Sequence, residues 1–372
     1  MTSSIEDFTI GVEEEYQIVN PATRELSQRV RRIMPKVKKA IGDDVSNELF
    51  QSQIEIGTHV CRTLAEIRDE LVRLRRSLIT EAERDGSRIA AAGTHPFSHW
   101  GDQALTPKAR YIGIAADFQQ LAREQIIFGC HVHVGFSDRE AAIQVMNRSR
   151  PWLAPILALS SSSPFWLGLD SGYASYRTEL FQRFPMAGTP QVFASRHEYD
   201  ELVAALVATG SISDASKIYW DIRPSSHLET LEYRVADVCM TVDEAVMVAG
   251  LCRALARTCH EQHRRGVPIK HARPELLRAA QWRASRFGVE AELIDIAARR
   301  AVPAASMISS LLDFLRPCLE NRGEWDEVAA LVRQTLERGT GSRRQRDAYE
   351  REGRFEDVVD LIIRETARGV SS

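Results

Sequence analysis

The sequence has few features of secreted or membrane proteins. Its six cysteines are dispersed over 372 residues and none are spaced as CxxC, which argues against a small disulfide-stapled scaffold. No basic and apolar leader opens the chain. The apolar stretch 152–159 contains Pro155 and is too short to span a bilayer. We therefore expect a cytoplasmic protein with reduced, mostly buried thiols and no contact with a membrane.

A surplus of either charge is also lacking. The 48 lysines and arginines against 51 aspartates and glutamates give a net charge of −3, which disfavours a surface that coats nucleic acid but leaves a local basic pocket open. A hydrophobic fraction of 44% suffices for a sizeable core. Neither a repeat nor a linker divides the sequence, so it favours a single domain over residues 1–372.

Two capping boxes mark the starts of long helices. Thr63 with Glu66 opens a helix that should run to Gly86, and Thr241 with Glu244 opens one that should end near Gly266, because the paired side chains satisfy free backbone N–H groups. Apolar spacing predicts mostly helix over 289–338 as well, with breaks at 316–317 and 321–323.

Five short segments alternate between apolar and polar residues, as half-buried strands do. They span 9–19, 53–56, 130–136, 218–223 and 230–236, and their polar faces carry carboxylates, imidazoles and guanidiniums but no lysine. An ordinary solvated strand face would carry more lysine, serine and threonine. We predict an α+β fold, with a curved antiparallel sheet, helices on its apolar face, and a charged face left open as a site.

Each polar pair on these strands has an ordinary explanation. Glu13 and Glu15 could form a solvated edge, His131 and His133 a hydrogen-bonded pair, and single glutamates such as Glu55 often have no function. Gathered on one concave face with Glu232, however, the glutamates would repel one another unless cations lay among them. Oxygen-rich ligands with at most two imidazoles favour Mg²⁺ or Mn²⁺ over zinc.

Arg223 and Arg234 add fixed positive charge to the same face, as phosphoryl transfer requires. The motifs GxxxxGK[ST], GxGxxG, HExxH and GxSxG are missing from the sequence. The combination predicts a phosphoryl-transfer site without a P-loop.

Several ordered motifs carry a family resemblance over nearly the whole chain. They are Gly11-Val-Glu-Glu-Glu-Tyr, Ser52-Gln-Ile-Glu, Gly93-Thr-His-Pro-Phe, Phe128-Gly-Cys-His-Val-His-Val-Gly, Trp220-Asp-Ile-Arg-Pro and Leu231-Glu-Tyr-Arg-Val-Ala-Asp. The sequence resembles the bacterial carboxylate-amine ligases known as type 2 glutamate-cysteine ligases. The resemblance implies a glutamine synthetase/guanidino kinase-like catalytic domain, a homodimer, ATP with Mg²⁺ or Mn²⁺, and γ-glutamyl transfer through an acyl phosphate in glutathione-type thiol biosynthesis.

The same resemblance implies roles for nine residues. Metal ligands would be Glu13, Glu15, Glu55, His131 and Glu232, with His131 and Glu232 sharing one ion and Glu55 helping to hold another. ATP phosphates and the catalytic charge would be held by His133, Arg223 and Arg234. Arg177 would bind the α-carboxylate of glutamate. No role follows for Glu14, and His95 reads as structural more readily than as catalytic.

Alternatives remain open at this point. One alternative concerns the glycine-rich segment Gly339-Thr-Gly341, which is followed by Arg343, Arg344 and Arg346. It could belong to a lid, with the tail 339–372 closing over the site, or it could be a solvated helix terminus, which we favour. The substrates could be glutamate and cysteine, our first choice, or another carboxylate and amine. A non-catalytic nucleotide- or amino-acid-binding paralogue and a zinc hydrolase built on the two histidines are the competing function classes.

Overall fold

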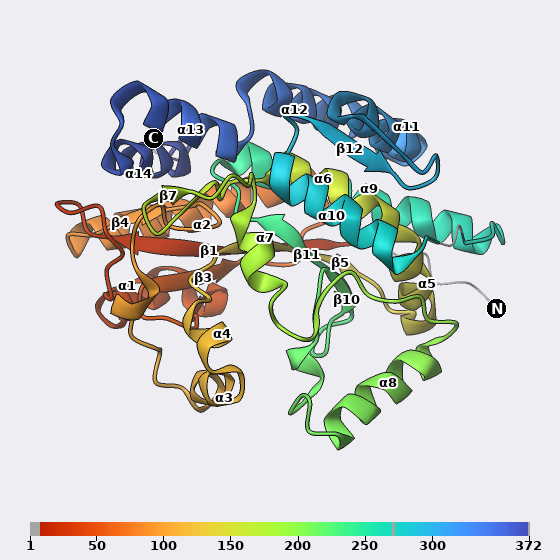
Figure 1. The fold of residues 1–372 in the computed structure, drawn as a ribbon, viewed down its shortest axis with the longest axis horizontal. Coiled ribbons are helices and arrows are strands. Elements are labelled where there is room, and N and C mark those ends of the chain that lie inside the picture. The colour runs from red at the N-terminus through yellow and green to blue at the C-terminus, as the bar shows by residue number, and fades with distance from the viewer. Residues whose placement is uncertain (1–7, 270–271, 371–372) are drawn as a thin grey trace.

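An antiparallel sheet of seven strands forms the centre of the described chain (Figure 1). The computed structural model describes residues 8–269 and 272–370. The strand order is β10-β11-β5-β1-β3-β2, and β4 pairs with the end of β1 on the edge opposite β3, beyond β5. The strands are β1 (Ile10–Val19), β2 (Val45–Asn47), β3 (Gln53–Gly57), β4 (Arg88–Ala90), β5 (Gly129–Gly135), β10 (Ile222–Pro224) and β11 (Thr230–Asp237).

All five predicted strands belong to this sheet, but the segment 218–223 is divided. It forms β9 (Tyr219–Trp220) and β10, and β9 pairs in parallel with β8 (Ala187–Gly188). Asp221 lies at the break, where its buried carboxylate accepts a hydrogen bond from Thr189 at 3.1 Å. The alternation within 218–223 predicts that Asp221 shares the open charged face with Arg223, and this prediction is wrong, because the change of pairing partner turns the chain at this residue.

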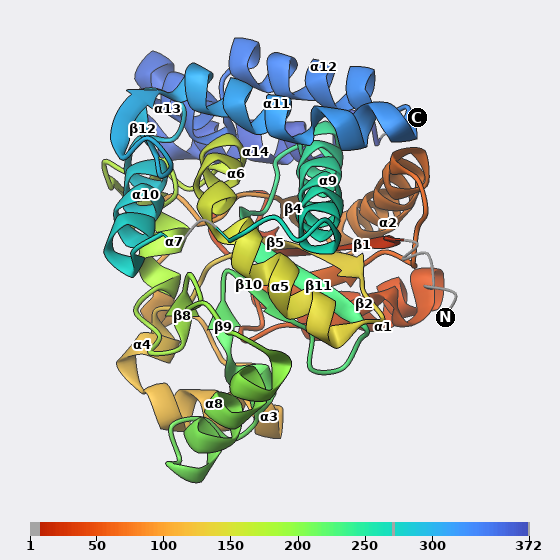
Figure 2. The same ribbon diagram turned by 90° about the vertical axis from the view of Figure 1, so that its right-hand side faces the viewer.

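Helices cover the apolar face of the sheet, above it in Figure 1 and again in the turned view of Figure 2. α9 begins at the complete Thr241–Glu244 capping box, and Thr63 caps α2. Apolar residues of β1, β5 and β11 form one buried cluster with the predicted stripe of α9. The helices on this side are α2 (Leu64–Arg84), α5 (Arg139–Ser149), α6 (Leu153–Ser160) and α9 (Val242–Arg264).

Five further helices lie on the other side of the sheet or at its edge. In Figure 1, α1, α3, α4 and α8 lie below the sheet, and α7 lies in front of it. Their bounds are α1 (Val30–Ile41), α3 (Ala109–Phe118), α4 (Gln120–Arg123), α7 (Tyr176–Phe181) and α8 (Arg196–Ala208). A small hairpin, β6 (Phe165–Trp166) with β7 (Leu169–Asp170), precedes α7.

The last hundred residues depart from the helical prediction at two places. The segment after Val289 forms a hairpin and not the predicted helix. Its strands are so short that their apolar residues fit a period of two and a helical period equally well. Pro317 does not end its helix, whereas Gly323 does, in the left-handed conformation. The elements are α10 (Pro274–Phe287), β12 (Glu292–Asp295), β13 (Arg300–Pro303), α11 (Ala304–Arg322), α12 (Trp325–Arg338), α13 (Gly341–Glu352) and α14 (Phe355–Thr366).

The C-terminal helices α13 and α14 lie on the helical side of the sheet (Figure 1). Arg344 is buried between Glu244 and Glu365, and Gln345 donates to the carbonyl of Ser162 at 2.7 Å. The favoured reading of this segment as a solvated helix terminus is thus wrong for Arg344. Closure of the tail over the site stays a prediction and would require the tail to leave these contacts.

Two findings bear on the expectations from composition. Among the described helices, none combines the length and the apolar character needed to cross a membrane. All six cysteines are buried and free.

Candidate active site

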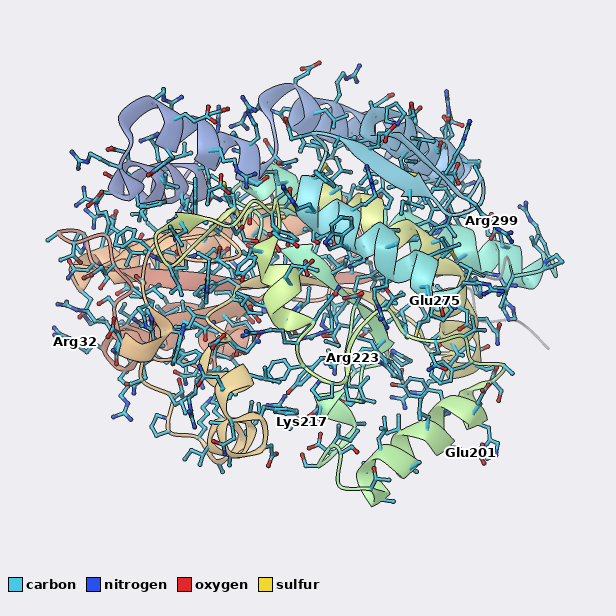
Figure 3. The ribbon with its side chains drawn as sticks, viewed as in Figure 1. Arg32, Glu201, Lys217, Arg223, Glu275 and Arg299 are labelled. Carbon is cyan, nitrogen blue, oxygen red and sulfur yellow. The ribbon has the colours of Figure 1, made fainter. Side chains whose placement is uncertain are left out.

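The polar face of the sheet forms the wall of a cavity of about 530 Å³. All nine residues singled out from the sequence line it, and β1, β3, β5, β10, β11 and α7 supply them. Figure 3 labels one of them, Arg223, beneath the sheet near the middle of the molecule, with Lys217 below it. The structure therefore brings together every side chain that we selected.

The sheet register explains this convergence. Glu13 is opposite His131 on β5, and Glu15 is opposite Glu55 on β3. Glu232 on β11 is opposite His133 on the other side of β5. Since facing residues of antiparallel strands point to the same side of a sheet, the acids and imidazoles form adjacent rows on one face.

The first group of candidate metal ligands is Glu13, His133 and Glu232, whose ligand atoms lie within 4.8 Å of one another. Glu13 also contacts His131 Nδ1 at 3.2 Å. Burial raises the pKa of Glu13, but the two histidines outweigh it and hold the pKa well below its ordinary value. His131 Nε2 is buried without a hydrogen-bond partner in the described chain, and His133 Nε2 lies 3.3 Å from Glu13 Oε1. Geometry thus groups His133, rather than His131, with Glu232, while both imidazoles contact Glu13.

The second group is Glu15, Glu48 and Glu55, again within 4.8 Å. Burial and the neighbouring acids raise the pKa of Glu48 to about 7 and that of Glu55 well above its ordinary value. Ser46 donates to Glu55 at 2.9 Å, and the backbone of Gly129 donates to Glu15 at 2.6 Å. Sequence reasoning missed Glu48, because it follows the short β2 in a segment without alternation.

The donor sets of both groups fit divalent cations. Three carboxylates that face one another repel when ionised, and a cation would relieve the repulsion. Four of the six side chains in the first and second groups come from β1, β3 and β11, and five of the six are carboxylates. Oxygen-rich sites of this kind suit Mg²⁺ or Mn²⁺.

Glu232 is held between two arginines. Arg223 donates to it through Nε at 2.8 Å and Nη2 at 3.3 Å, and Arg234 donates through Nη1. Burial raises the pKa of Glu232, but the two guanidiniums outweigh this and lower it. The remaining Arg223 nitrogen, Nη1, donates to the carbonyls of Ser216 and Ile218. Arg223 is therefore fully engaged in orienting Glu232, whereas Arg234 Nε has no partner in the described chain.

Arg177 lies beside this pair with spare hydrogen-bonding capacity. It is buried, its Nε has no partner among the described residues, and its nearest carboxylate, that of Asp237, is 3.9 Å away. A Cβ at Gly129 would collide with its guanidinium, so a larger residue there would displace Arg177. Arg177 is thus placed to receive an anionic group of a substrate.

The far wall of the cavity is rich in aromatic residues, and most of its members carried no signal in the sequence; Tyr219, on the polar side of the predicted strand 218–223, is the exception. The members come from α3, α7, the segment after α7 and β9, and they are Arg110, Tyr111, Phe181, Phe184 and Tyr219. Tyr111 donates to the carbonyl of Asn47 at 2.5 Å, and Arg110 to Ser216 at 3.0 Å. These contacts close the cavity opposite the charged sheet.

Two residues without an assigned role prove to be structural. Glu14 faces the apolar side of β1 and is paired, at full burial, with Arg75 of α2. His95 is buried too, with Nε2 2.9 Å from the carbonyl of Arg24 and Nδ1 accepting from the backbone of Ser98 at 3.0 Å. This arrangement fixes a neutral imidazole, and burial lowers the pKa of His95 to about 4.

Comparison with known proteins identifies the family. The model of glutamate-cysteine ligase family 2 matches residues 9–361. The chain belongs to this family. It is 41% identical over 363 residues to a Herpetosiphon aurantiacus protein, covering 98% of this chain and 94% of that one. It is 44% identical over 372 residues to a Frankia alni protein, covering 96% and 97%. They carry the provisional names glutamate–cysteine ligase 2 and glutamate–cysteine ligase 2-2, respectively.

Solved structures of related ligases share the fold. Glutamate–cysteine ligase of Francisella tularensis, in complex with AMP, superposes with a TM-score of 0.74 at 13% identity, covering 98% of this chain and 89% of that one. A bifunctional glutathione synthetase of Pasteurella multocida gives 0.67 at 14% identity, covering 98% and 52%. The predicted α+β ligase fold and the assignment to a ligase family are confirmed.

Proposed function

We propose that this family member joins the γ-carboxylate of glutamate to the amine of cysteine, with ATP as the phosphoryl donor. The observation that carries the proposal is the single cavity in which two carboxylate-rich groups face Arg177 and Arg234. The AMP bound to the Francisella ligase supports a nucleotide in a cavity of this fold.

The reaction would proceed in two displacements. A carboxylate oxygen of the acid attacks the γ-phosphorus, ADP leaves, and an acyl phosphate forms. The amine then attacks the acyl carbon, phosphate leaves, and the amide is made. No protein nucleophile is required, so the enzyme acts by positioning the reactants and stabilising charge.

The chain's own residues divide these tasks. Glu13, His133 and Glu232 would hold one divalent ion, and Glu15, Glu48 and Glu55 a second. When bound, such ions neutralise phosphate charge. Arg223 orients Glu232 through both Nε and Nη2. Arg234 is placed to face the transferred phosphoryl group, and Arg177 the α-carboxylate of the acid. The aromatic wall excludes water from an acyl phosphate.

The test is release of phosphate by the full chain with ATP and MgCl₂. Release that requires both glutamate and cysteine is expected. A panel of amino acids, tested in pairs, identifies the substrates if cysteine fails. ATP binding without turnover on any pair would leave a non-catalytic paralogue, and tightly bound zinc found by metal analysis would favour a hydrolase.

A cytoplasmic homodimer is part of the same proposal. Light scattering of the purified chain measures its mass in solution, and a monomer would contradict this part of the proposal.

A further inference from the structure

A second cavity lies beside the active-site cavity. It has a volume of about 450 Å³ and is bordered by the segment 182–191, by Arg150 at the start of a 3-10 turn, and by one face of α10. Phe184 belongs to the linings of both cavities, so they are neighbours at this ring. The volume is typical of small-molecule sites.

The charge of this lining has one sign. It contains Arg150, Arg183 and Arg278, and none of the described aspartates or glutamates contributes to it. Arg183 is paired with Glu124 at 2.6 Å, whereas neither Arg150 nor Arg278 forms an ion pair with a described carboxylate. Glu275, which Figure 3 labels on α10, is exposed and outside the lining.

Arg150 is the most unusual member of this lining. It is only 5% exposed, its Nε is buried without a partner, and none of its side-chain nitrogens donates a hydrogen bond to another described residue. Burial lowers the pKa of Arg150 to about 10, with no neighbouring carboxylate to oppose the effect. Gln281, which is 2% exposed, also has a buried amide nitrogen without a partner.

A buried guanidinium without a counter-charge destabilises a folded protein, and proteins rarely retain one without compensation. An oxyanion in the cavity would provide both the charge and the hydrogen-bond acceptors that Arg150 lacks. The planar fork of arginine matches the oxygens of phosphate and carboxylate groups. Arg183 and Arg278, both exposed at the rim, would add to the attraction.

We propose that this cavity binds a small ligand carrying a phosphate or carboxylate group, with Arg150 at its base. The site is distinct from the one in which the ligase substrates would react, and the inference does not rest on the ligase activity.

The test measures the thermal unfolding midpoint of the full chain against concentration of inorganic phosphate or, in a second arm, of succinate, at ionic strength held constant with NaCl. The two arms distinguish a phosphate from a carboxylate ligand. We expect the midpoint of the unsubstituted protein to rise in at least one arm. In that arm, Arg150→Met should weaken the apparent affinity by at least about tenfold. Any stabilisation through the active-site cavity is common to both proteins and cancels in the comparison.

The midpoint without phosphate or succinate separates a ligand site from a structural role. If Arg150 is kept for a ligand, Arg150→Met should unfold at the same or a higher temperature than the unsubstituted protein, because it removes an uncompensated buried charge. If that variant does not fold, Arg278→Ala, at the rim, still tests the site and should weaken the same response. Arg333→Ala, an exposed arginine of α12, is the matched control and should leave it unchanged.

Three results would overturn the proposal. The first is that the unfolding midpoints of the unsubstituted protein and of both cavity variants respond equally to the anions in both arms. The second is that Arg150→Met loses the same stability with and without the anions. The third is that Arg150→Met changes the oligomeric mass and leaves the response to the anions unchanged.

Discussion

The buried ion pair between Glu14 and Arg75 offers a quantitative test of how β1 is held. Both side chains have no exposed surface, and Arg75 donates to Glu14 through Nε at 3.0 Å and Nη2 at 2.5 Å. It also donates to the carbonyls of Cys239 and Met240. Glu14→Gln keeps the shape of the side chain but leaves the guanidinium without its counter-charge.

Loss of one partner of a buried pair destabilises a protein by about 3–5 kcal/mol. An unfolding entropy of about 2.1 cal/mol/K per residue, applied to 372 residues, gives roughly 0.8 kcal/mol/K. The unfolding midpoint of Glu14→Gln should therefore fall by about 4–6 °C, measured by calorimetry and checked by urea unfolding.

Two further variants make this test specific. Adding Arg75→Met to Glu14→Gln should recover much of the loss, because the unpaired charge is gone. Asp200→Asn, which removes an exposed i,i+4 pair with Arg196, should change the unfolding free energy by less than about 1 kcal/mol. If Glu14→Gln proves as harmless as Asp200→Asn, or if the double variant is no better than the single one, the pair does not hold β1 as argued.

Three further predictions concern the active-site cavity and His95. Glu232→Gln should lower metal-dependent phosphate release by about 10²–10³-fold with an unchanged circular dichroism spectrum, and undiminished release would refute its assignment. Glu48→Gln should raise the unfolding midpoint in metal-free buffer above pH 7, since it removes like-charge repulsion, and it should weaken the stabilisation of the protein by MgCl₂. Glu201→Gln changes an exposed residue and is the control. If both variants respond in the same way, Glu48 is not a metal ligand. Because the folded pKa of His95, about 4, lies below the ordinary histidine value of 6.5, the stability it contributes is complete above pH 6.5 and is lost as pH falls toward 4. His95→Gln should therefore flatten that fall by up to about 3 kcal/mol, measured by urea unfolding at several pH values, and parallel curves would show that His95 is not responsible.

The period-two pattern of the sequence was sufficient to predict five strand segments and eight residues of the cavity, because a strand face is defined by alternation alone. Arg177, on α7, was found through the family resemblance instead. Glu48 was missed, since a three-residue strand and the irregular turn after it have no period to read. Tyr219 lies on the polar side of the alternating segment 218–223, but Phe181 and Phe184 face the cavity through the path of the chain in and after α7, which is a property of tertiary packing and not of local sequence. The sequence pattern predicts helix for the hairpin after Val289, because strands of this length are too short to show whether the apolar residues recur with a period of two or with the period of a helix.

Three consecutive glutamates on β1 serve opposite sides of one layer: Glu13 and Glu15 enter the cavity, and Glu14 meets Arg75 in the interior. A shift of the strand pairing by a single residue would turn all three side chains to the opposite face of the sheet. The carboxylates of Glu13 and Glu15 would then be buried with a single guanidinium between them, and both would be missing from the cavity. Misregistered molecules would thus be unstable and would also lack both groups of candidate metal ligands. Correct pairing of β1 and assembly of the proposed cation sites are therefore a single condition.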